Sequence, residues 1–416
     1  MLERVPPQFH ELQEITMQTD TRDILAHATR QAESYEDYFL VDIDAHVTET
    51  SFWPEIIGSI DNEVIRQMGE ANMARPGNTT SLLNVAPGIL HQHAYGRIPH
   101  QQALMEKVEK GKVHHFTELA RRSMDALGLD YQIVFPTPML TLGMHPQDEI
   151  EVALGRAYNK WLVERILPED DRLKGLIYLP FNTPEACVEL VEQYAGVDSV
   201  IGFTVCSTRN KPVHHNNYMR LYSLMEESGK PFAFHSGFNW GDPSFLQLNR
   251  FISMHALSFV HYSLIHMTNW IMNGLPERFP KLPVVWIEAG LAWVPFLMQR
   301  LDHEYMLRSS ECPTLKKKPS DYMRDMYYSS QPMEVQDMGA LETTFRMINA
   351  ETQLLYSSDY PHWDFDLPST IYDLPFLSEK AKHNILGGSA GRLFKLKPRN
   401  ERQRENLARI GNLTAE

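Results

Sequence analysis

Cysteine is scarce in this sequence, and its few cysteines lie far apart. The 416 residues include only Cys187, Cys206 and Cys312, and no two of them have the CxxC spacing of a zinc or redox motif. A disulfide framework needs paired cysteines at regular spacings, so this chain is not expected to contain one. The pattern favours a reducing compartment, and we expect the cytoplasm.

Long hydrophobic runs and an excess of positive charge are also missing. No stretch of about 18 apolar residues occurs, so no membrane span is expected. The N-terminal segment MLERVPPQFHELQEITMQTD is charged and lacks the apolar stretch of a signal peptide. With 39 Lys and Arg against 53 Asp and Glu, the net charge of -14 argues against nucleic acid or an anionic membrane as a partner.

Short apolar runs instead alternate with longer amphipathic segments along most of the chain. Such alternation predicts parallel strands joined by right-handed helical crossovers. The expected strands are Phe39–Ile43, Gln132–Pro136, Lys174–Leu179, Val200–Val205, Pro231–His235, Pro283–Glu288, Met326–Ser329 and Leu354–Ser358. The expected helices are Glu149–Leu167, Pro184–Tyr194, Asn217–Ser228, Phe259–Asn273, Trp293–Met306, Glu334–Asn349 and Ser378–Phe394.

Eight such units predict a (β/α)8 TIM barrel over residues 39–396. TIM barrels run from about 250 to over 400 residues, which suits this chain. Several of the strands are continuous apolar runs, as expected when both faces of a strand are buried. An open doubly wound sheet is the alternative, and it is less favoured because no Gly-rich phosphate loop follows any strand.

Three segments exceed what a barrel needs. Residues 1–38 form an expected helical N-terminal arm, and residues 397–416 a polar C-terminal tail. Residues 50–130 are an insertion after the first strand, with helix expected from His100 to Leu127. An insertion there lies on the catalytic face, so we interpret it as a lid.

The N-terminal arm, the insertion and the C-terminal tail also bear on assembly, because arms of this kind commonly wrap around neighbouring subunits. We therefore expect a homo-oligomer or a complex with a related barrel subunit, with disordered termini as the alternative.

Ionisable residues end four of the eight apolar runs. The first run ends in Asp44 and His46, which are two residues apart and therefore point to the same side of a strand. The fifth, sixth and eighth runs end in His235, Glu288 and Asp359. Each could be an ordinary polar strand end. Because charged groups are almost never buried without a partner, four such ends favour a divalent cation at the barrel mouth.

Further residues are candidates for the same site. Two metal ions would need more ligands, and these could come from Glu49 or from His255, His261 and His266 before the sixth strand, although each is individually more typical of packing. For substrate binding the candidates are Trp240, Trp293 and His362, with core packing as the alternative for the tryptophans.

Four sequence blocks resemble the amidohydrolase-related group, which includes aminocarboxymuconate-semialdehyde decarboxylase. The blocks are DIDAH, FHSG, GLPERFPKLPVVWIEAGLAWVPFLMQRLD and LLYSSDYPHWD. The resemblance implies a metal at the barrel mouth, held by Asp44, His46 and His235, with Asp359 as ligand or catalytic base. This chain departs from the decarboxylases at Glu288, where they have a catalytic histidine. That departure counts against decarboxylation, because a carboxyl group donates a proton at neutral pH only when its pKa is raised.

Two further blocks, PSDYMRDMYYSSQPME and DFDLPSTIYDLPFLSE, resemble a subunit of bacterial iron/manganese-dependent 2-aminoisobutyrate hydroxylases. This resemblance implies O2-dependent hydroxylation of a small aliphatic amino acid at a dinuclear iron/manganese centre, with Glu288 as a catalytic, bridging ligand. Mixed carboxylate and imidazole ligands also suit iron or manganese. We take this hydroxylase as the leading expectation. The alternatives are a mononuclear zinc or manganese decarboxylase or hydrolase of a small carboxylate, and a non-catalytic metal-bound partner subunit.

Overall fold

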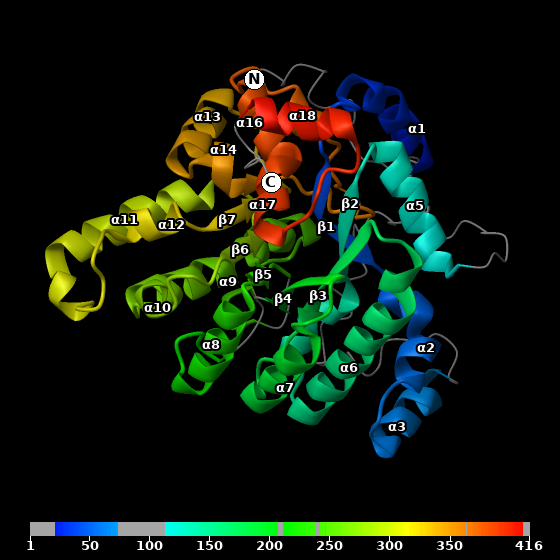
Figure 1. Ribbon diagram of the computed structural model, residues 1–416. Helices are drawn as coiled ribbons and strands as arrows, with labels where there is room; N and C mark the ends of the chain where they lie inside the picture. Colours follow the sequence, from blue (N-terminus) through cyan, green and yellow to red (C-terminus); the bar gives the residue numbers. More distant parts are fainter. Residues whose placement is uncertain are drawn as a thin grey trace.

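The computed structural model describes residues 21–73, 113–206, 211–237, 242–245, 247–362 and 364–410. Within these residues, eight parallel strands form one sheet in the order β1 to β8, and helices surround it (Figure 1). The expected TIM barrel is confirmed. None of the helices in the described ranges is long and apolar enough to cross a membrane.

The strands lie close to their expected positions. They are β1 Val41–Val47, β2 Tyr131–Pro136, β3 Leu173–Tyr178, β4 Val200–Cys206, β5 Phe232–His235, β6 Val284–Ile287, β7 Tyr327–Ser329 and β8 Leu354–Leu355. The largest differences are at the seam of the barrel, where β1 extends to Val47 and β8 ends at Leu355 rather than Ser358. β8 ends early because the Tyr356 amide donates to the Ile385 carbonyl, 2.9 Å away, and not to a strand.

Individual hydrogen bonds join β8 to β1 and exclude the open-sheet alternative. The Ile43 amide donates to the Tyr356 carbonyl (3.0 Å), and the Asp359 amide donates to the Asp44 carbonyl (2.8 Å). The His46 amide then donates to the Tyr360 carbonyl (2.7 Å), beside an isolated parallel bridge between Ala45 and Tyr360. The barrel seam is thus closed near the mouth by the segment that follows β8.

Most helices fall where the sequence predicts them, with informative differences at their ends. The predicted helix Glu334–Asn349 begins only at Met338, because the Asp337 side chain accepts the Ala340 amide and caps that position. The predicted helix Ser378–Phe394 is interrupted by a π-helical turn, Asn384–Gly388. The helices are α1 Thr21–Ala32, α2 Trp53–Gly58, α3 Glu63–Met73, α5 His115–Leu127, α6 Asp148–Trp161, α7 Pro184–Tyr194, α8 Met219–Ser228, α9 Phe251–Met272, α10 Leu275–Arg278, α11 Trp293–Arg308, α12 Pro319–Met323, α13 Met338–Met347, α14 Ala350–Gln353, α15 Ser369–Tyr372, α16 Glu379–His383, α17 Ser389–Phe394 and α18 Glu401–Arg409.

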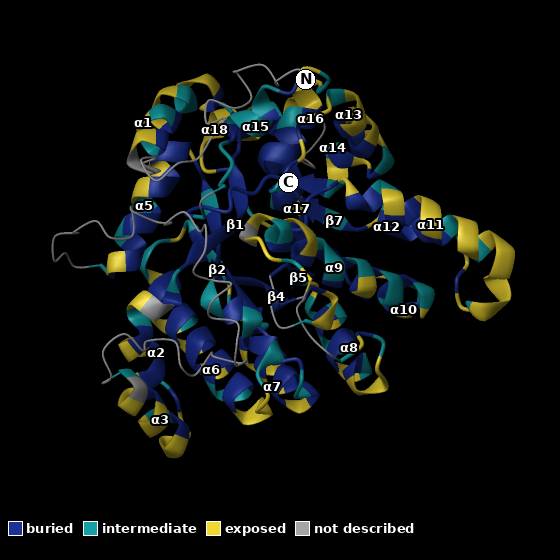
Figure 2. Ribbon diagram, turned by 180° about the vertical axis from the view of Figure 1, so that it is seen from behind, coloured by how far each residue is buried: buried dark blue, intermediate teal, exposed yellow. Residues whose placement is uncertain are grey.

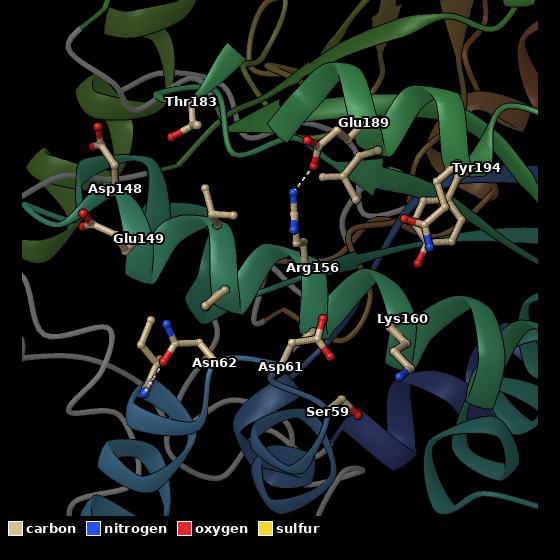
Figure 3. A pocket seen from close by; sticks show the side chains of 16 residues that line it. Ser59, Asp61, Asn62, Asp148, Glu149, Arg156, Lys160, Thr183, Glu189 and Tyr194 are labelled. Atoms are coloured by element: carbon tan, nitrogen blue, oxygen red, sulfur yellow. Dashed lines mark hydrogen bonds and ion pairs between the residues drawn. The ribbon is translucent and has the colours of Figure 1, made fainter. Parts of the chain in front are cut away.

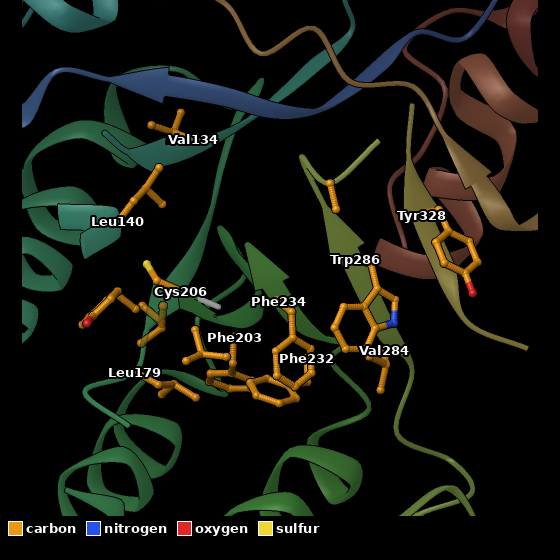
Figure 4. Close-up of a cluster of buried hydrophobic side chains, with 14 of the residues drawn as sticks. Val134, Leu140, Leu179, Phe203, Cys206, Phe232, Phe234, Val284, Trp286 and Tyr328 are labelled. Carbon is orange, nitrogen blue, oxygen red and sulfur yellow. The ribbon is translucent and has the colours of Figure 1, made fainter. Parts of the chain in front are cut away.

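Two hydrophobic clusters fill the two sides of the sheet. Alternate strand residues such as Phe232 and Phe234 face the surrounding helices, where Phe234 stacks on Trp286 with ring centroids 4.5 Å apart (Figure 4). Intervening residues such as Ala233 and Val285 fill the barrel interior. Figure 2 shows the strands as buried, whereas exposed residues lie mainly on the outer helices. With its lower interior packed by apolar residues, the barrel leaves only its mouth for polar chemistry.

The arm, the insertion and the tail are only partly covered by the described residues. In the arm, α1 packs against α5. The insertion includes α2, α3 and α5, and residues 74–112 lie outside the described part, so the lid stays a prediction. The segment expected as a polar tail contains α18, whose Leu407 packs in the interior cluster and whose Gln403 donates to the Tyr38 carbonyl (3.0 Å). α18 therefore helps to close the barrel end opposite the mouth.

Gly387 allows a close backbone contact between the π-helical turn and the chain before β1. A Cβ atom at residue 387 would lie 2.0 Å from the carbonyl oxygen of Phe39. Because that obstacle is backbone, it cannot rotate away. Gly387→Ala is expected to lower the free energy of unfolding by about 1–3 kcal/mol in urea titrations. Gly58→Ala is the control, since a Cβ there meets nothing within 4 Å. Equal stability of the two variants would contradict this account.

Candidate metal centre

A bulge in β1 directs Asp44 and His46 into the barrel. Asp42 lies opposite Gln132, but Ala45 lies opposite Val134, so β1 contains one more residue than β2 over this stretch. Such a bulge re-aims the side chains that follow it. Although Ile43 faces the interior cluster, Asp44 and His46 also converge on the interior. The alternation of side chains along a strand predicts that Asp44 and His46 point to the same side of β1. The bulge determines that this side is the barrel interior.

Glu288 and Asp359 share an unusual backbone conformation. Both have a φ of 60°, in the left-handed region that residues other than glycine rarely adopt. Glu288 directly follows β6, where its amide donates to the Ser329 hydroxyl (2.8 Å). Such a conformation costs about 1–3 kcal/mol and clusters at functional sites. Here it turns each carboxylate toward the barrel axis immediately after the strand region.

Five side chains from β1, β5 and the segments after β6 and β8 meet at the mouth. Asp44 Oδ1 lies 3.1 Å from His235 Nε2 and 3.3 Å from His46 Nε2. Asp359 Oδ1 lies 3.2 Å from His46 Nε2, and Glu288 Oε2 lies 3.5 Å from His235 Nδ1. All five are buried. Potential ligand atoms form two overlapping groups, each within 4.8 Å: Asp44, His46, His235 and Glu288, and His46, Glu288, Asp359 and His362.

Backbone carbonyls fix the orientation of both buried imidazoles. His46 Nδ1 lies 2.9 Å from the Pro136 carbonyl, and His235 Nδ1 lies 2.8 Å from the Ser236 carbonyl. Because a carbonyl only accepts, each Nδ1 carries the proton in the neutral ring, and each Nε2 presents a lone pair to the carboxylates. Lone pairs facing carboxylates repel unless a positive charge lies between them. This is the usual arrangement of a histidine that binds a metal.

Four polar atoms at the centre fit a divalent cation. Asp44 Oδ2, His46 Nε2, Glu288 Oε2 and Asp359 Oδ2 are buried and accept no hydrogen bond from the described residues. Leaving buried polar atoms unpaired is costly. A cation would pair them together, and a mixed set of imidazole nitrogens and carboxylate oxygens suits manganese, iron or zinc.

The pKa shifts show how strongly the centre attracts positive charge. Burial raises the pKa of the Asp44 carboxyl, but His235 and His46 outweigh burial and hold that pKa below its usual range. Burial lowers the pKa of His46, but hydrogen bonds to Asp359 and Asp44 outweigh it and raise the pKa to about 10. Burial, with the charges of Asp359 and Asp44, raises the pKa of Glu288 well above its usual range. The buried carboxylates therefore make this centre attractive to positive charge.

His362, a candidate for substrate binding, lies at the mouth beside His46, Glu288 and Asp359. Its Nδ1 is 2.6 Å from Asp359 Oδ1, and its Nε2 is 3.3 Å from the Thr137 hydroxyl. The ring centroid lies 4.1 Å from that of His46. At 13 % exposure, the side chain of His362 is the most accessible of the cluster. His362 therefore contacts the Asp359 carboxylate and is the member of the cluster most open to the mouth.

The structure does not bring the other predicted ligands to this centre. The Glu49 carboxylate accepts the amides of Thr137 (2.9 Å) and Met139 (2.6 Å), so it anchors the turn after β2. His255 and His261 lie on α9, in ring contact with Phe259 and Phe245 respectively, and His266 on the same helix is in ring contact with Phe234. None of these four belongs to either ligand group. Helix α9 is longer than predicted and uses its histidines for packing.

Of the two tryptophans predicted to bind substrate, only Trp293 lies within the described residues. Trp293 is buried at the start of α11, where its indole nitrogen donates to the Gly290 carbonyl (2.9 Å) and its ring lies 6.3 Å from that of Trp286. It therefore belongs to the outer core and not to a substrate pocket. Trp240 lies outside the described residues, so its predicted role stays a prediction.

A pocket of about 560 Å³ lies elsewhere, between α3, α6 and α7 (Figure 3). Its lining includes the exposed ion pair between Arg156 and Glu189, together with Asp61 and Lys160. No member of the two ligand groups lines it. This pocket is therefore separate from the two ligand groups at the barrel mouth.

Comparisons with known proteins agree with this geometry. Residues 41–396 match the amidohydrolase family. The gamma-resorcylate decarboxylase of Rhizobium sp. is 22% identical over 289 residues, which cover 66% of this chain and 85% of that protein. The gamma-resorcylate decarboxylase of Rhodococcus jostii is 20% identical over 264 residues, covering 60% and 79%.

Solved structures share the fold. The 5-carboxyvanillate decarboxylase of Sphingomonas paucimobilis has a TM-score of 0.62 and 21% identity, covering 86% of this chain and 100% of that one. A dihydroxybenzoic acid decarboxylase of Polaromonas sp., solved with bound manganese and 2-nitroresorcinol, has a TM-score of 0.59 and 17% identity, covering 86% and 97%.

These relatives overturn the leading expectation from the sequence. They are decarboxylases and not oxygenases, so the O2-dependent hydroxylase, and the oxidoreductase class with it, is wrong. The dinuclear centre also lacks support. The two ligand groups overlap at both His46 and Glu288, so they are not two separate sets, and His46 Nε2 has one lone pair for one ion. Since the matched region spans the whole barrel, the chain belongs to the amidohydrolase family.

Proposed function

We propose that the chain is a metal-dependent decarboxylase of a small aromatic carboxylate. The observation that carries this proposal is the set of buried ligand atoms at the mouth that lack hydrogen-bond donors among the described residues. Relatives that cover most of the barrel and are named as decarboxylases support the reaction class. Simple hydrolysis at the same centre is the alternative, and it would leave the carboxylate of the substrate in place.

In this proposal a single divalent ion is held by Asp44, His46, His235 and Asp359. These residues supply two imidazole nitrogens and two carboxylates, a donor set that suits manganese. Manganese is also the ion bound in the Polaromonas relative. Zinc remains the alternative, since it accepts the same ligand types. Metal analysis of protein purified without chelators distinguishes the two.

The reaction breaks the bond between the ring carbon and the carboxylate carbon. When bound, the ion would orient the oxygen atoms of the substrate and stabilise negative charge on them. Glu288, whose Oε2 lies 3.5 Å from His235 Nδ1 and which is not one of the four proposed ligands, donates a proton to the ring carbon. CO2 then departs with its carboxylate carbon, the bonding electrons return to the ring, and the Glu288 carboxylate takes up a proton from solvent. The products are CO2 and the arene with hydrogen at that position.

His362 and Thr137 orient the substrate in this proposal. His362 is fixed by Asp359 on one ring nitrogen and approaches Thr137 with the other, so a small shift would free that nitrogen for a substrate oxygen. Hydroxylated carboxylates fit this arrangement, because a hydroxyl beside the carboxylate offers a second oxygen to the centre.

Association with a second copy or a related barrel subunit stays a prediction that light scattering can test.

The proposed activity is tested by following CO2 release from manganese-loaded protein. We expect release from 2,6-dihydroxybenzoate or 5-carboxyvanillate, and none from benzoate, which lacks the adjacent hydroxyl. Removing the metal with a chelator should abolish release, and adding manganese back should restore it. Fully loaded protein that releases CO2 from none of a panel of hydroxylated aromatic carboxylates would contradict the proposal.

A further inference from the structure

We infer that Asp42, which is not one of the proposed ligands, positions two of them, Asp44 and Asp359. This inference rests on the metal centre of the proposed function. Asp42 is fully buried as the second residue of β1, between the apolar residues Val41 and Ile43. A buried carboxylate needs several donors around it, and those around Asp42 come from Asp44, from Ser358 next to Asp359, and from Gln132 of β2.

The first of these contacts concerns Asp44. Asp42 Oδ1 accepts the backbone amide of Asp44, 3.2 Å away. Such a bond between a side chain and the amide two residues later is typical of a local turn and competes with regular strand pairing. It spans the start of the stretch in which the β1–β2 register shifts, between Asp42 and Ala45. The bulge that directs Asp44 inward is therefore held by Asp42.

The second set of contacts concerns Asp359 and comes from Ser358, 316 residues further along the chain than Asp42. Asp42 Oδ1 accepts the amide of Ser358 (2.8 Å), and Asp42 Oδ2 accepts its hydroxyl (2.6 Å). The Ser358 hydroxyl in turn accepts the amide of Tyr360 (3.0 Å). Ser358 and Tyr360 flank Asp359, whose φ of 60° is strained. A strained residue persists only where its neighbours are fixed, and Asp42 holds Ser358 directly and Tyr360 through the Ser358 hydroxyl.

A third contact explains why residue 42 is a carboxylate and not an amide. Gln132 of β2 donates its side-chain amide to Asp42 Oδ2, 3.2 Å away. Asp42 thus links β1, β2 and the segment after β8, at the seam where individual hydrogen bonds close the barrel. All of its neighbours in these contacts are donors. An asparagine at 42 has one acceptor oxygen only, so its amide group would face the Gln132 or Ser358 donors.

The experiment compares Asp42→Asn with Asp130→Asn. Asp130 is a second buried aspartate, which accepts the Leu40 amide (2.9 Å) and the Gln403 side chain (2.9 Å) far from the ligand groups. Both variants should melt at lower temperature. Only Asp42→Asn should weaken manganese binding, by about 10–100-fold in chelator competition, and change the electron paramagnetic resonance spectrum of bound manganese. Asp130→Asn should keep the wild-type affinity and spectrum.

The outcomes separate this inference from the proposed function. Unchanged manganese affinity in folded Asp42→Asn, or an equal loss in Asp130→Asn, would overturn the positioning role alone. A wild-type protein that binds no divalent ion at all would overturn the proposed function and the inference with it. If Asp42→Asn does not fold, Ser358→Ala takes its place, because it removes only the hydroxyl contacts. It should weaken manganese binding several-fold, and an unchanged affinity would contradict the inference.

Discussion

His235→Ala is expected to yield purified protein with almost no bound metal and no measurable CO2 release. His235 supplies the Nε2 lone pair beside Asp44, and its ring is fixed by the Ser236 carbonyl. Removing it leaves Asp44 facing a buried void without its nitrogen partner. Loss of a residue that merely supports a ligand costs about 10–100-fold in metal affinity, so loss of a ligand should exceed that. Inductively coupled plasma mass spectrometry on protein purified without chelators measures the effect.

His261→Ala is the matched control for this prediction. His261 is a histidine on α9 that packs against Phe245 and belongs to neither ligand group. Its variant should retain the wild-type metal content and melting temperature within a few degrees. Full metal occupancy in His235→Ala, or clear loss of metal in His261→Ala, would mean that the ion is held elsewhere.

The convergence of the candidate ligands was predictable from the sequence because of the barrel's geometry. Carboxyl ends of all strands in a parallel barrel meet at one face, so ionisable residues at strand ends must lie near one another. Asp44, His46, His235 and Asp359 follow this rule, and Glu288 joins them. No detail of loop structure was needed for this prediction.

The local conformations of the site were not predictable in the same way. The bulge at Asp42 depends on Ser358 and Gln132, which are distant in sequence, and the left-handed turns at Glu288 and Asp359 depend on partners from other strands. Asp42 is nevertheless noticeable in the sequence, because it is a charged residue two positions before Asp44 in a strand that is otherwise apolar up to that point. Alternation alone gives no reason to assign it a role, because its donors appear only when the barrel closes.

The predictions from residue type and from partial resemblance failed for physical reasons. Glu49, His255 and His261 are possible ligands by chemistry, but backbone amides and aromatic rings already contact them. The blocks at 319–334 and 364–379 suggested a hydroxylase, yet they contribute no member of either ligand group. They contain packing and capping contacts instead, such as Glu334 accepting the Leu291 amide (3.0 Å). Sequence similarity in segments that only pack and cap other elements is evidence for a shared fold, but not for a shared reaction.

Glu288→Gln is expected to retain its metal and to lose about 100- to 10,000-fold in turnover, the range that proton transfer typically contributes. Glutamine keeps the shape of the side chain and an acceptor oxygen, but it cannot donate a proton and become a carboxylate. Because four other residues are proposed to hold the ion, the metal content should stay within error of the wild type. Single-turnover CO2 release and metal analysis on the same sample give both quantities.

Glu334→Gln is the control, since Glu334 accepts the amides of Leu291 and Ala292 in the turn just after Glu288 but reaches neither ligand group. It should turn over at close to the wild-type rate. If Glu288→Gln instead loses its metal, Glu288 is a ligand, and the proton must come from another residue, with His362 the nearest candidate. If Glu288→Gln keeps both metal and turnover, protonation does not involve residue 288. Only a Glu288→Gln variant that keeps its metal and loses turnover supports the Glu288 carboxyl group as the proton donor. The resemblance to decarboxylases led us to expect a histidine at this position.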